Sequence, residues 1–280
     1  MRLVDSHCHL QAEQFAVDVA EVLAAAEGGG VERILVPGWD LASNIAALAL
    51  IDRFPRLAGV AVGIHPHAAA ETGSGAWAEV VALAADPRVV AIGETGLDFD
   101  RMWSPRDVQL ANLRSNLELA LATGKPAILH CRSKPGERDA QDALIDELRA
   151  AGFGGAAGRG AFGSRPPAIL HSVSGPVDYV EAALEMGCAV AVSGLAFRRG
   201  EEATAESVRR VPAERLLVET DAPYLSPPGA PRRRNEPRYV ETTARWVAEQ
   251  RGEDIDALGD MLVAAYDAMF PRIPGRTVPG

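Results

Sequence analysis

Six residues able to bind divalent cations each follow a short apolar run, although these runs are spread along the whole chain. They are His7, His9, Glu94, His130, His171 and Asp221. Imidazole nitrogens and carboxylate oxygens are the groups with which proteins hold the metal ions that activate water. Four of the chain's six histidines belong to this set, and histidines placed at random would not gather at the ends of apolar runs. The pattern therefore indicates a site for more than one divalent cation.

The first two of these residues lie in the segment Val-Asp-Ser-His-Cys-His. His7 and His9 are two positions apart, so in an extended chain both imidazoles point to one side while Cys8 points to the other. Two imidazole nitrogens on one side can bind one ion. Asp5 shares this face, where it is either a group that orients a ligand or a solvated aspartate at a strand end.

Glu94, His130 and His171 follow strongly apolar segments. A carboxylate after Val-Val-Ala-Ile-Gly is costly to bury without a partner, so Glu94 either pairs with an arginine or binds metal. Its two oxygens could bridge two cations, as in binuclear hydrolases. His130 and His171 each end an Ile-Leu-His run. Either one alone would suit an ordinary core histidine, but two such endings on successive strands favour metal ligands.

The remaining candidates follow two further runs. Asp221, in Val-Glu-Thr-Asp, is placed to face the metals and a bound water, whereas Glu219 lies deeper and is expected to be structural. His65 ends another run and is interpreted either as a substrate contact or as a turn residue. His67 is expected at the surface. Arg132 directly follows the His-Cys pair at 130–131, where its planar guanidinium could hold a phosphate oxygen or form an ordinary salt bridge.

Eight apolar runs are predicted to form parallel strands buried on both faces. The runs are Arg2–Asp5, Val31–Pro37, Ala58–Ile64, Val89–Glu94, Ala127–His130, Ala168–His171, Ala189–Ser193 and Arg215–Glu219. Helical periodicity separates them, as in Leu113–Leu121, with Pro105 suited to the start of that helix and Gly124 to its end. This alternation predicts a single TIM-type (β/α)8 barrel domain over residues 1–280, of the metal-dependent hydrolase type. A doubly wound open sheet is the alternative, but only a closed barrel brings the ends of so many strands together.

Composition limits the function classes. The formal net charge of −10 argues against a non-specific nucleic-acid coat protein, whose affinity comes from many Lys and Arg contacts to phosphate. No apolar stretch reaches the ~20 residues of a membrane span, and the first residues contain no secretory segment. The three cysteines have no paired spacing, which predicts a reducing, cytoplasmic setting. We expect no membrane partner and no obligate protein partner.

These motifs resemble those of the TatD family of metal-dependent deoxyribonucleases, within the amidohydrolase-like barrels, over nearly the whole chain. They are Asp-Ser-His-Cys-His-Leu at 5–10, Gly-Ile-His-Pro at 63–66, Gly-Glu-Thr-Gly-Leu-Asp at 93–98, His-Cys-Arg at 130–132, His-Ser-Val-Ser-Gly at 171–175, Glu-Thr-Asp-Ala-Pro-Tyr-Leu at 219–225 and Arg-Asn-Glu-Pro at 234–237. Each motif is short, but their combined order and spacing are highly specific for this family.

The resemblance implies two divalent ions, Mg²⁺, Zn²⁺ or Mn²⁺, and hydrolysis of DNA phosphodiester bonds, with 3′–5′ exonuclease action on single strands or ends. One ion would be held by His7, His9 and Asp221. The other would be held by His130 and His171, with Glu94 bridging the two. In this hypothesis Glu94 and Asp221 are catalytic: a hydroxide bridging the metals attacks phosphorus, and Asp221 accepts its proton. His65 and Arg132 would contact the substrate.

Three departures from the family pattern concern the substrate. After the eighth strand the family usually has an aromatic residue or His followed by Arg-Gly, where this chain has Ala230, Pro231 and Arg232. The segment Ser133–Arg138 separates His-Cys-Arg from Asp-Ala and could alter the groove. The glycine-rich Gly152–Gly163 is expected to be a flexible loop at the face opposite the site.

Other hypotheses remain open at this point. Arg232–Arg234 and Arg238 are either a basic rim for a nucleic-acid backbone or a solvated arginine run. An amidohydrolase, or a hydrolase of small phosphoesters or lactones, is an alternative enzyme. Many such enzymes bridge their metals with a modified lysine on the fourth strand, and neither Lys125 nor Lys134 is placed there. A non-catalytic metal-binding barrel is a third possibility, against which the complete ligand set argues.

Overall fold

A computed structural model describes residues 1–54, 57, 59–270 and 273 and contains one eight-stranded sheet. Its strands are β1 (Leu3–Asp5), β2 (Val31–Pro37), β3 (Gly59–Val62), β4 (Val89–Asp98), β5 (Ala127–Arg132), β6 (Ala168–Leu170), β7 (Ala189–Val192) and β8 (Leu216–Val218). Each strand pairs in parallel with the next one along the chain. Each strand lies within or overlaps one of the predicted runs, with bounds that differ by one or a few residues, and Ala58 lies outside the described residues.

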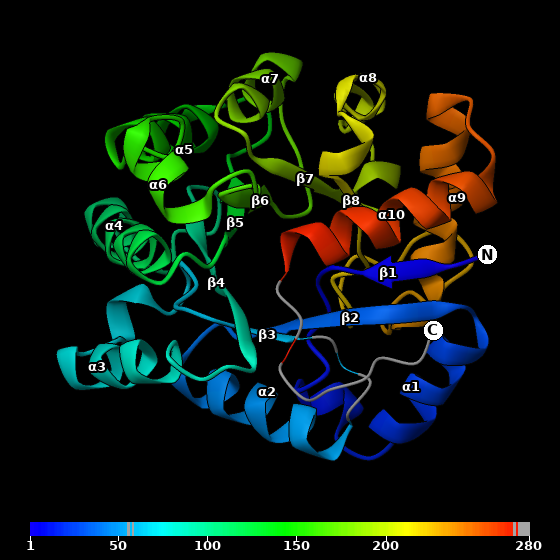
Figure 1. Cartoon of the computed structure of the whole chain (residues 1–280), viewed down its shortest axis with the longest axis horizontal. Coiled ribbons are helices and arrows are strands. Elements are labelled where there is room, and N and C mark those ends of the chain that lie inside the picture. Colours follow the sequence, from blue (N-terminus) through cyan, green and yellow to red (C-terminus); the bar gives the residue numbers. More distant parts are fainter. Residues whose placement is uncertain (55–56, 58, 271–272, 274–280) are drawn as a thin grey trace.

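The first and last strands meet, so the sheet curls into a nearly closed barrel (Figure 1). The Ser6 amide donates a hydrogen bond to the Val218 carbonyl at 3.1 Å, and Cys8 forms a parallel bridge with Ala222. The predicted (β/α)8 fold is confirmed. Because all the strands run in the same direction, the residues that follow them converge at one rim of the barrel.

Helices connect the strands and surround them (Figure 1). They are α1 (Val19–Gly28), α2 (Leu41–Arg53), α3 (Ser74–Leu83), α4 (Arg106–Thr123), α5 (Asp139–Ala150), α6 (Ala156–Phe162), α7 (Val177–Glu185), α8 (Glu202–Arg210), α9 (Val240–Arg251) and α10 (Ile255–Met269). Helix α4 follows Pro105 and ends at Gly124, whose φ of 64° suits glycine, as the sequence predicted.

Helix α10 covers the amino-terminal end of the barrel, away from the predicted ligands. Its Gly259 packs so closely that a Cβ there would lie 2.3 Å from the Arg2 carbonyl oxygen, just before β1. Its Asp267 accepts a hydrogen bond from Arg33 Nε at 3.1 Å near the start of β2. Buried apolar residues from β1 through α10 form one continuous core.

One of the two insertions differs from its prediction. The glycine-rich Gly152–Gly163 is not a flexible loop, because α6 forms within it and buries Phe162 against Phe153. Arg165 just beyond it donates to the Gly124 carbonyl, which precedes β5, so this segment does lie at the face opposite the predicted site. The Ser133–Arg138 segment forms the turn before α5, where the Ser133 hydroxyl binds Gln141 at 2.6 Å.

Strand β4 continues to Asp98, so Glu94 lies within a strand rather than at its end. The pairing of β4 with β5 shifts in register between Ile92 and Thr95, and Gly93 has a φ of 139° that favours glycine. A Cβ at Gly93 would also lie 2.7 Å from the Ile128 carbonyl oxygen. This irregularity interrupts the alternation of β4 at Glu94.

No described helix combines the length and the apolar character that crossing a membrane requires.

Candidate metal centre

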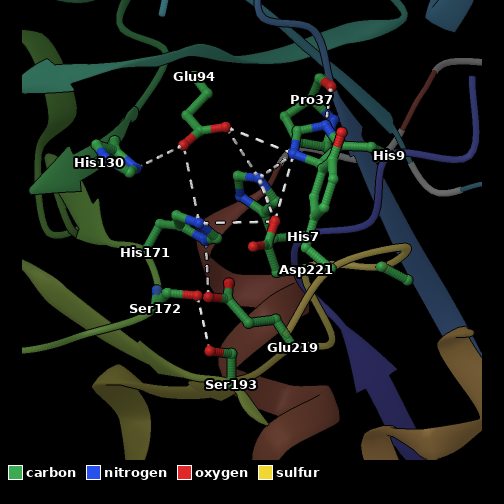
Figure 2. A network of polar contacts seen from close by, with 12 residues as sticks. His7, His9, Pro37, Glu94, His130, His171, Ser172, Ser193, Glu219 and Asp221 are labelled. Atoms are coloured by element: carbon green, nitrogen blue, oxygen red, sulfur yellow. Dashed lines mark hydrogen bonds and ion pairs between the residues drawn. The ribbon is translucent and has the colours of Figure 1, made fainter. Parts of the chain in front are cut away.

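The six predicted ligands converge at the carboxyl-terminal rim of the barrel around the Glu94 carboxylate (Figure 2). Glu94 Oε2 lies 3.2 Å from His7 Nε2 and 3.6 Å from His9 Nε2. These two imidazole nitrogens are 3.1 Å apart, as their spacing on one face predicted. The first set of candidate ligands is therefore His7, His9 and one oxygen of Glu94.

The other oxygen of Glu94 faces a second set of imidazoles. Glu94 Oε1 lies 3.2 Å from His130 Nδ1 and 3.8 Å from His171 Nε2. His65 Nε2 is 3.4 Å from the same oxygen, which places the side chain of His65 at the edge of the cluster. Glu94 thus stands between two groups of ligand atoms.

Asp221 completes the cluster from the loop after β8. Its Oδ1 lies 3.4 Å from His9 Nε2, 3.8 Å from His7 Nε2 and 3.9 Å from His171 Nε2. The backbone of Asp221 has a φ of 54°, and its amide donates to the His7 carbonyl at 2.9 Å. The turn therefore directs this carboxylate back toward the residues that follow β1.

Buried hydrogen bonds between the ends of β1 and β8 hold these ligands in place. Asp5 accepts hydrogen bonds from the Thr220 hydroxyl at 2.5 Å and from the Thr220 amide at 2.9 Å. Burial raises the pKa of Asp5 to about 8, although the bonds from Thr220 oppose the rise. Asn235 donates to the Thr220 and Tyr224 carbonyls, both at 2.8 Å. Asp5 therefore orients the ligand segments, which is one of its two predicted roles.

Backbone and carboxylate acceptors favour the imidazole tautomers that suit metal binding. His9 Nδ1 lies 3.1 Å from the Pro37 carbonyl oxygen, and His171 Nδ1 lies 2.7 Å from Glu219 Oε1 (Figure 2). In both rings the Nδ1 side faces an oxygen, so Nε2 is the nitrogen turned toward the cluster, where its lone pair can bind a cation. Lone pairs and carboxylate oxygens that face one another in a buried space require positive charge among them, so these residues fit divalent cations.

The ionisation of the cluster fits the same conclusion. Burial alone would raise the pKa of Glu94, but the imidazoles of His65 and His7 outweigh it and hold this pKa well below its usual range. Burial lowers the pKa of His65 to about 4, so His65 is neutral at physiological pH. Burial also lowers the pKa of His171, but Glu219 and Glu94 raise it to about 10. The proton on His171 is one that a bound cation would replace.

His67 and Asp98 form a partly buried pair that the apolar pattern does not predict. His67 was expected at the surface, but its Nε2 lies 2.7 Å from Asp98 Oδ2, and its side chain is only 24% exposed. Asp98 Oδ2 is also 3.4 Å from His130 Nε2, on the opposite side of the ring from Glu94. The expectation for His67 was wrong because its partner comes from the extension of β4, which the apolar pattern did not reveal.

The arginines considered for phosphate binding differ in their partners. Arg132 Nε lies 2.9 Å from Asp100 Oδ2, and its side chain is 46% exposed at the rim. Arg234 pairs with Asp18, and Arg238 pairs with Glu236. Both therefore belong to a network of surface ion pairs rather than to a free basic rim. Arg232 instead lines a pocket with Phe197 and Arg198.

The family model for TatD related DNase matches residues 4–271. The chain belongs to this family. The 3′-5′ ssDNA/RNA exonuclease TatD of Erwinia billingiae is 35% identical over 97% of this chain and 100% of its own length. An uncharacterised metal-dependent hydrolase of Bacillus subtilis, YabD, is 32% identical over 96% of this chain and 98% of its own.

Solved structures agree with this assignment. The TatD homologue YjjV of Escherichia coli K12 superposes with a TM-score of 0.82 at 26% identity, covering 96% of this chain and 98% of that one. The chain is therefore a TatD-type metal-dependent hydrolase. Lys125 donates to the Ala84 and Asp86 carbonyls before β4, so it does not serve as the lysine bridge considered for the amidohydrolase alternative.

Proposed function

We propose that this hydrolase is a 3′–5′ exonuclease that cleaves phosphodiester bonds at the ends of single-stranded DNA or RNA with two divalent cations. The observation that carries the proposal is the Glu94 carboxylate, whose two oxygens face two separate sets of imidazoles at 3.2–3.8 Å. Membership of the TatD family and similarity to the 3′-5′ ssDNA/RNA exonuclease of Erwinia billingiae support the nucleic-acid substrate.

The residues divide naturally between two ions. His7, His9 and Asp221 would hold one, His130 and His171 would hold the other, and Glu94 would be shared by both. When bound, such ions polarise a phosphoryl oxygen and lower the pKa of a water molecule. Their identity is proposed to be Mg²⁺, Mn²⁺ or Zn²⁺, since the mixed imidazole and carboxylate set suits each of them.

The two carboxylates of the cluster differ in their access to solvent. The side chain of Glu94 is 4% exposed and has both oxygens engaged, whereas that of Asp221 is 13% exposed. Asp221 is therefore the carboxylate that can accept a proton from an attacking water at its Oδ atoms. As the water oxygen bonds to phosphorus, the bond to the leaving sugar oxygen breaks. Glu94 holds the ligand arrangement and accepts no proton.

His65 and Arg132 are proposed to bind the substrate. His65 lies at the edge of the cluster beside Glu94, where its neutral imidazole can donate to a phosphate oxygen. Arg132 is half-exposed at the rim and can exchange its Asp100 partner for a phosphate. A cytoplasmic location is proposed from the cysteines, since Cys8, Cys131 and Cys188 are all free.

The test is hydrolysis of an end-labelled single-stranded oligonucleotide by wild type and by Glu94→Gln, with Mg²⁺, Mn²⁺ or Zn²⁺ supplied. The amide lacks the charge that two cations require, so kcat/KM should fall by about 10²–10³-fold or more. Glu241→Gln, which loses only an exposed ion pair with Arg245 on α9, should retain wild-type activity. Near-full activity of Glu94→Gln would show that the shared carboxylate is not required.

A second outcome distinguishes the alternative enzyme class. Wild type that releases no nucleotide from DNA or RNA with any of the three ions, yet opens small lactones or amides, would replace the nuclease proposal with the amidohydrolase one.

A further inference from the structure

Exposed aromatic side chains occur at two places in the described residues, and both are at the rim of the metal centre. Trp103 is 68% exposed and Tyr224 is 52% exposed, whereas the other described Phe, Trp and Tyr side chains are buried or half-buried. Trp103 lies on the loop between β4 and α4. Tyr224 lies three residues after Asp221. An aromatic ring left in water at a catalytic rim calls for a ligand with a flat apolar face.

Each ring contacts a histidine on a different side of Glu94. The Trp103 ring centroid is 4.3 Å from that of His67, and the His67 centroid is 4.3 Å from that of His65. His65 in turn lies 3.4 Å from Glu94 Oε1. Trp103 is therefore connected through two imidazoles to one oxygen of the shared carboxylate.

The second ring, that of Tyr224, lies near His9 on the side of Glu94 Oε2. The Tyr224 ring centroid is 6.0 Å from that of His9, and His9 Nε2 lies 3.6 Å from Glu94 Oε2. The two exposed rings consequently flank the cluster, one on the Oε1 side and one on the Oε2 side.

Hydrogen bonds fix the backbone that carries each ring. Ser104, next to Trp103, accepts from the Ala70 amide at 3.0 Å, and its carbonyl accepts from Gln109 at 2.8 Å. The Tyr224 amide donates to the Asp221 carbonyl at 2.8 Å. The backbone that carries each ring is thus ordered before any substrate arrives, which lowers the entropic cost of binding.

Nucleobases suit such rings better than other ligands of a phosphodiester hydrolase. Each base has a flat face, and stacking on an aromatic side chain contributes roughly 1–3 kcal/mol per base. Paired bases already stack within a duplex and do not offer this face to the protein. Arg101 is exposed on the same loop as Trp103 and forms no ion pair within the described part of the chain, which leaves its guanidinium available to a backbone phosphate.

We propose that Trp103 and Tyr224 are stacking platforms for the unpaired bases on either side of the cleaved phosphate, so that they select single-stranded substrates. This inference rests on the proposed nuclease function and names the residues that would recognise the bases.

The experiment uses two oligothymidylates, one complete and one in which the last two nucleotides are abasic, with Mn²⁺ as the metal. In wild type the abasic ends should raise KM by about 30-fold or more, because two stacked bases are lost and each contributes about 5- to 150-fold. Trp103→Ala should raise KM for the complete oligonucleotide by about 5- to 150-fold, the contribution of one base, with kcat largely retained, and should have little effect on the abasic one. Trp103→Phe should restore most of the affinity. Tyr224→Leu should behave like Trp103→Ala.

The outcomes separate this inference from the function on which it rests. Hydrolysis of both oligonucleotides by wild type, with a KM for the complete one that Trp103→Ala and Tyr224→Leu leave unchanged, would overturn the stacking roles alone. An equal rise in KM for both oligonucleotides would do the same, because the lost contact would not be to a base. Absence of hydrolysis of either oligonucleotide by wild type would overturn the nuclease proposal and the stacking roles together.

Discussion

The Glu219 carboxylate orients a ligand of the cluster without entering the cluster itself. Its Oε1 lies 2.7 Å from His171 Nδ1 and accepts the Ser172 amide at 2.5 Å, and the Ser6 hydroxyl donates to its Oε2 at 3.2 Å. The position of Glu219 two residues before Asp221 predicts a deeper, structural side chain. Glu219 is indeed more deeply buried than Asp221. A carboxylate at this place also increases the basicity of the imidazole that would bind metal.

Glu219→Gln should therefore weaken metal binding while preserving the fold. The amide can still accept from the Ser172 amide, but it removes the negative charge beside His171, and such outer partners typically change affinity by about 10–100-fold. Titration calorimetry with Mn²⁺ should show this loss at one of two sites. Glu214→Gln, at the exposed turn before β8, is the matched control. Equal weakening in both variants would show that the effect is not specific to His171.

At the scale of elements, β4 shows both what the sequence could predict and what it could not. The strand positions and the convergence of the six ligands follow from local apolar runs combined with the one-directional topology of a barrel. The extension of β4 to Asp98 depends on its non-local pairing with β5, so the contact of Asp98 with His67 could not be read from apolar runs. Helix α6 was missed because its glycines hide the helical periodicity.

An ion pair in the turn between α3 and β4, formed by Asp86 and Arg88, should make a pH-dependent contribution to stability. Asp86 accepts hydrogen bonds from Arg88 Nη2 at 2.6 Å and from Arg88 Nε at 2.9 Å, and the Arg88 side chain holds the pKa of Asp86 below its usual 3.8. Since the folded state keeps Asp86 ionised to lower pH than the unfolded state does, its stabilisation is present above about pH 4 and is lost as the pH falls further.

Asp86→Asn should lower the free energy of unfolding by about 0.5–1 kcal/mol at pH 7, and the difference from wild type should be smaller at pH 3, below the ordinary pKa of an aspartate. Chemical denaturation at the two pH values provides the measurement. Asp146→Asn, whose side chain is 79% exposed and 3.8 Å from Arg149, should change stability little at either pH. A deficit of the same size at pH 3 as at pH 7 would contradict the ion-pair explanation.

At the scale of the whole molecule, the barrel is sealed at one end and chemically active at the other. Helix α10 packs its Gly259 against the backbone at Arg2, below β1, while the ligand loops occupy the opposite rim. The net charge of −10 is compatible with a nucleic-acid substrate, because the metal ions would supply positive charge where the phosphate binds.

Gly259→Ala tests how closely α10 seals the barrel. The new methyl group would lie 2.3 Å from a backbone oxygen, so the helix must shift, and we expect a loss of about 1–3 kcal/mol in the free energy of unfolding. Gly160→Ala in α6, where a Cβ meets no atom within 4 Å, should be neutral or stabilising by up to about 1 kcal/mol. Both substitutions favour helix formation, so thermal denaturation of the pair isolates the steric effect. Equal stability of the two variants would argue against close packing of α10.

The most direct test of the account is an anomalous difference map from crystals soaked in Mn²⁺. We predict two peaks in the centre, one among His7, His9 and Asp221 and the other beside His130 and His171, with the Glu94 carboxylate between them. In crystals of Glu94→Gln at the same Mn²⁺ concentration, at least one peak should weaken strongly. A wild-type map with no peak among these side chains, or with a single ion that Glu94 does not touch, would contradict the shared-carboxylate arrangement.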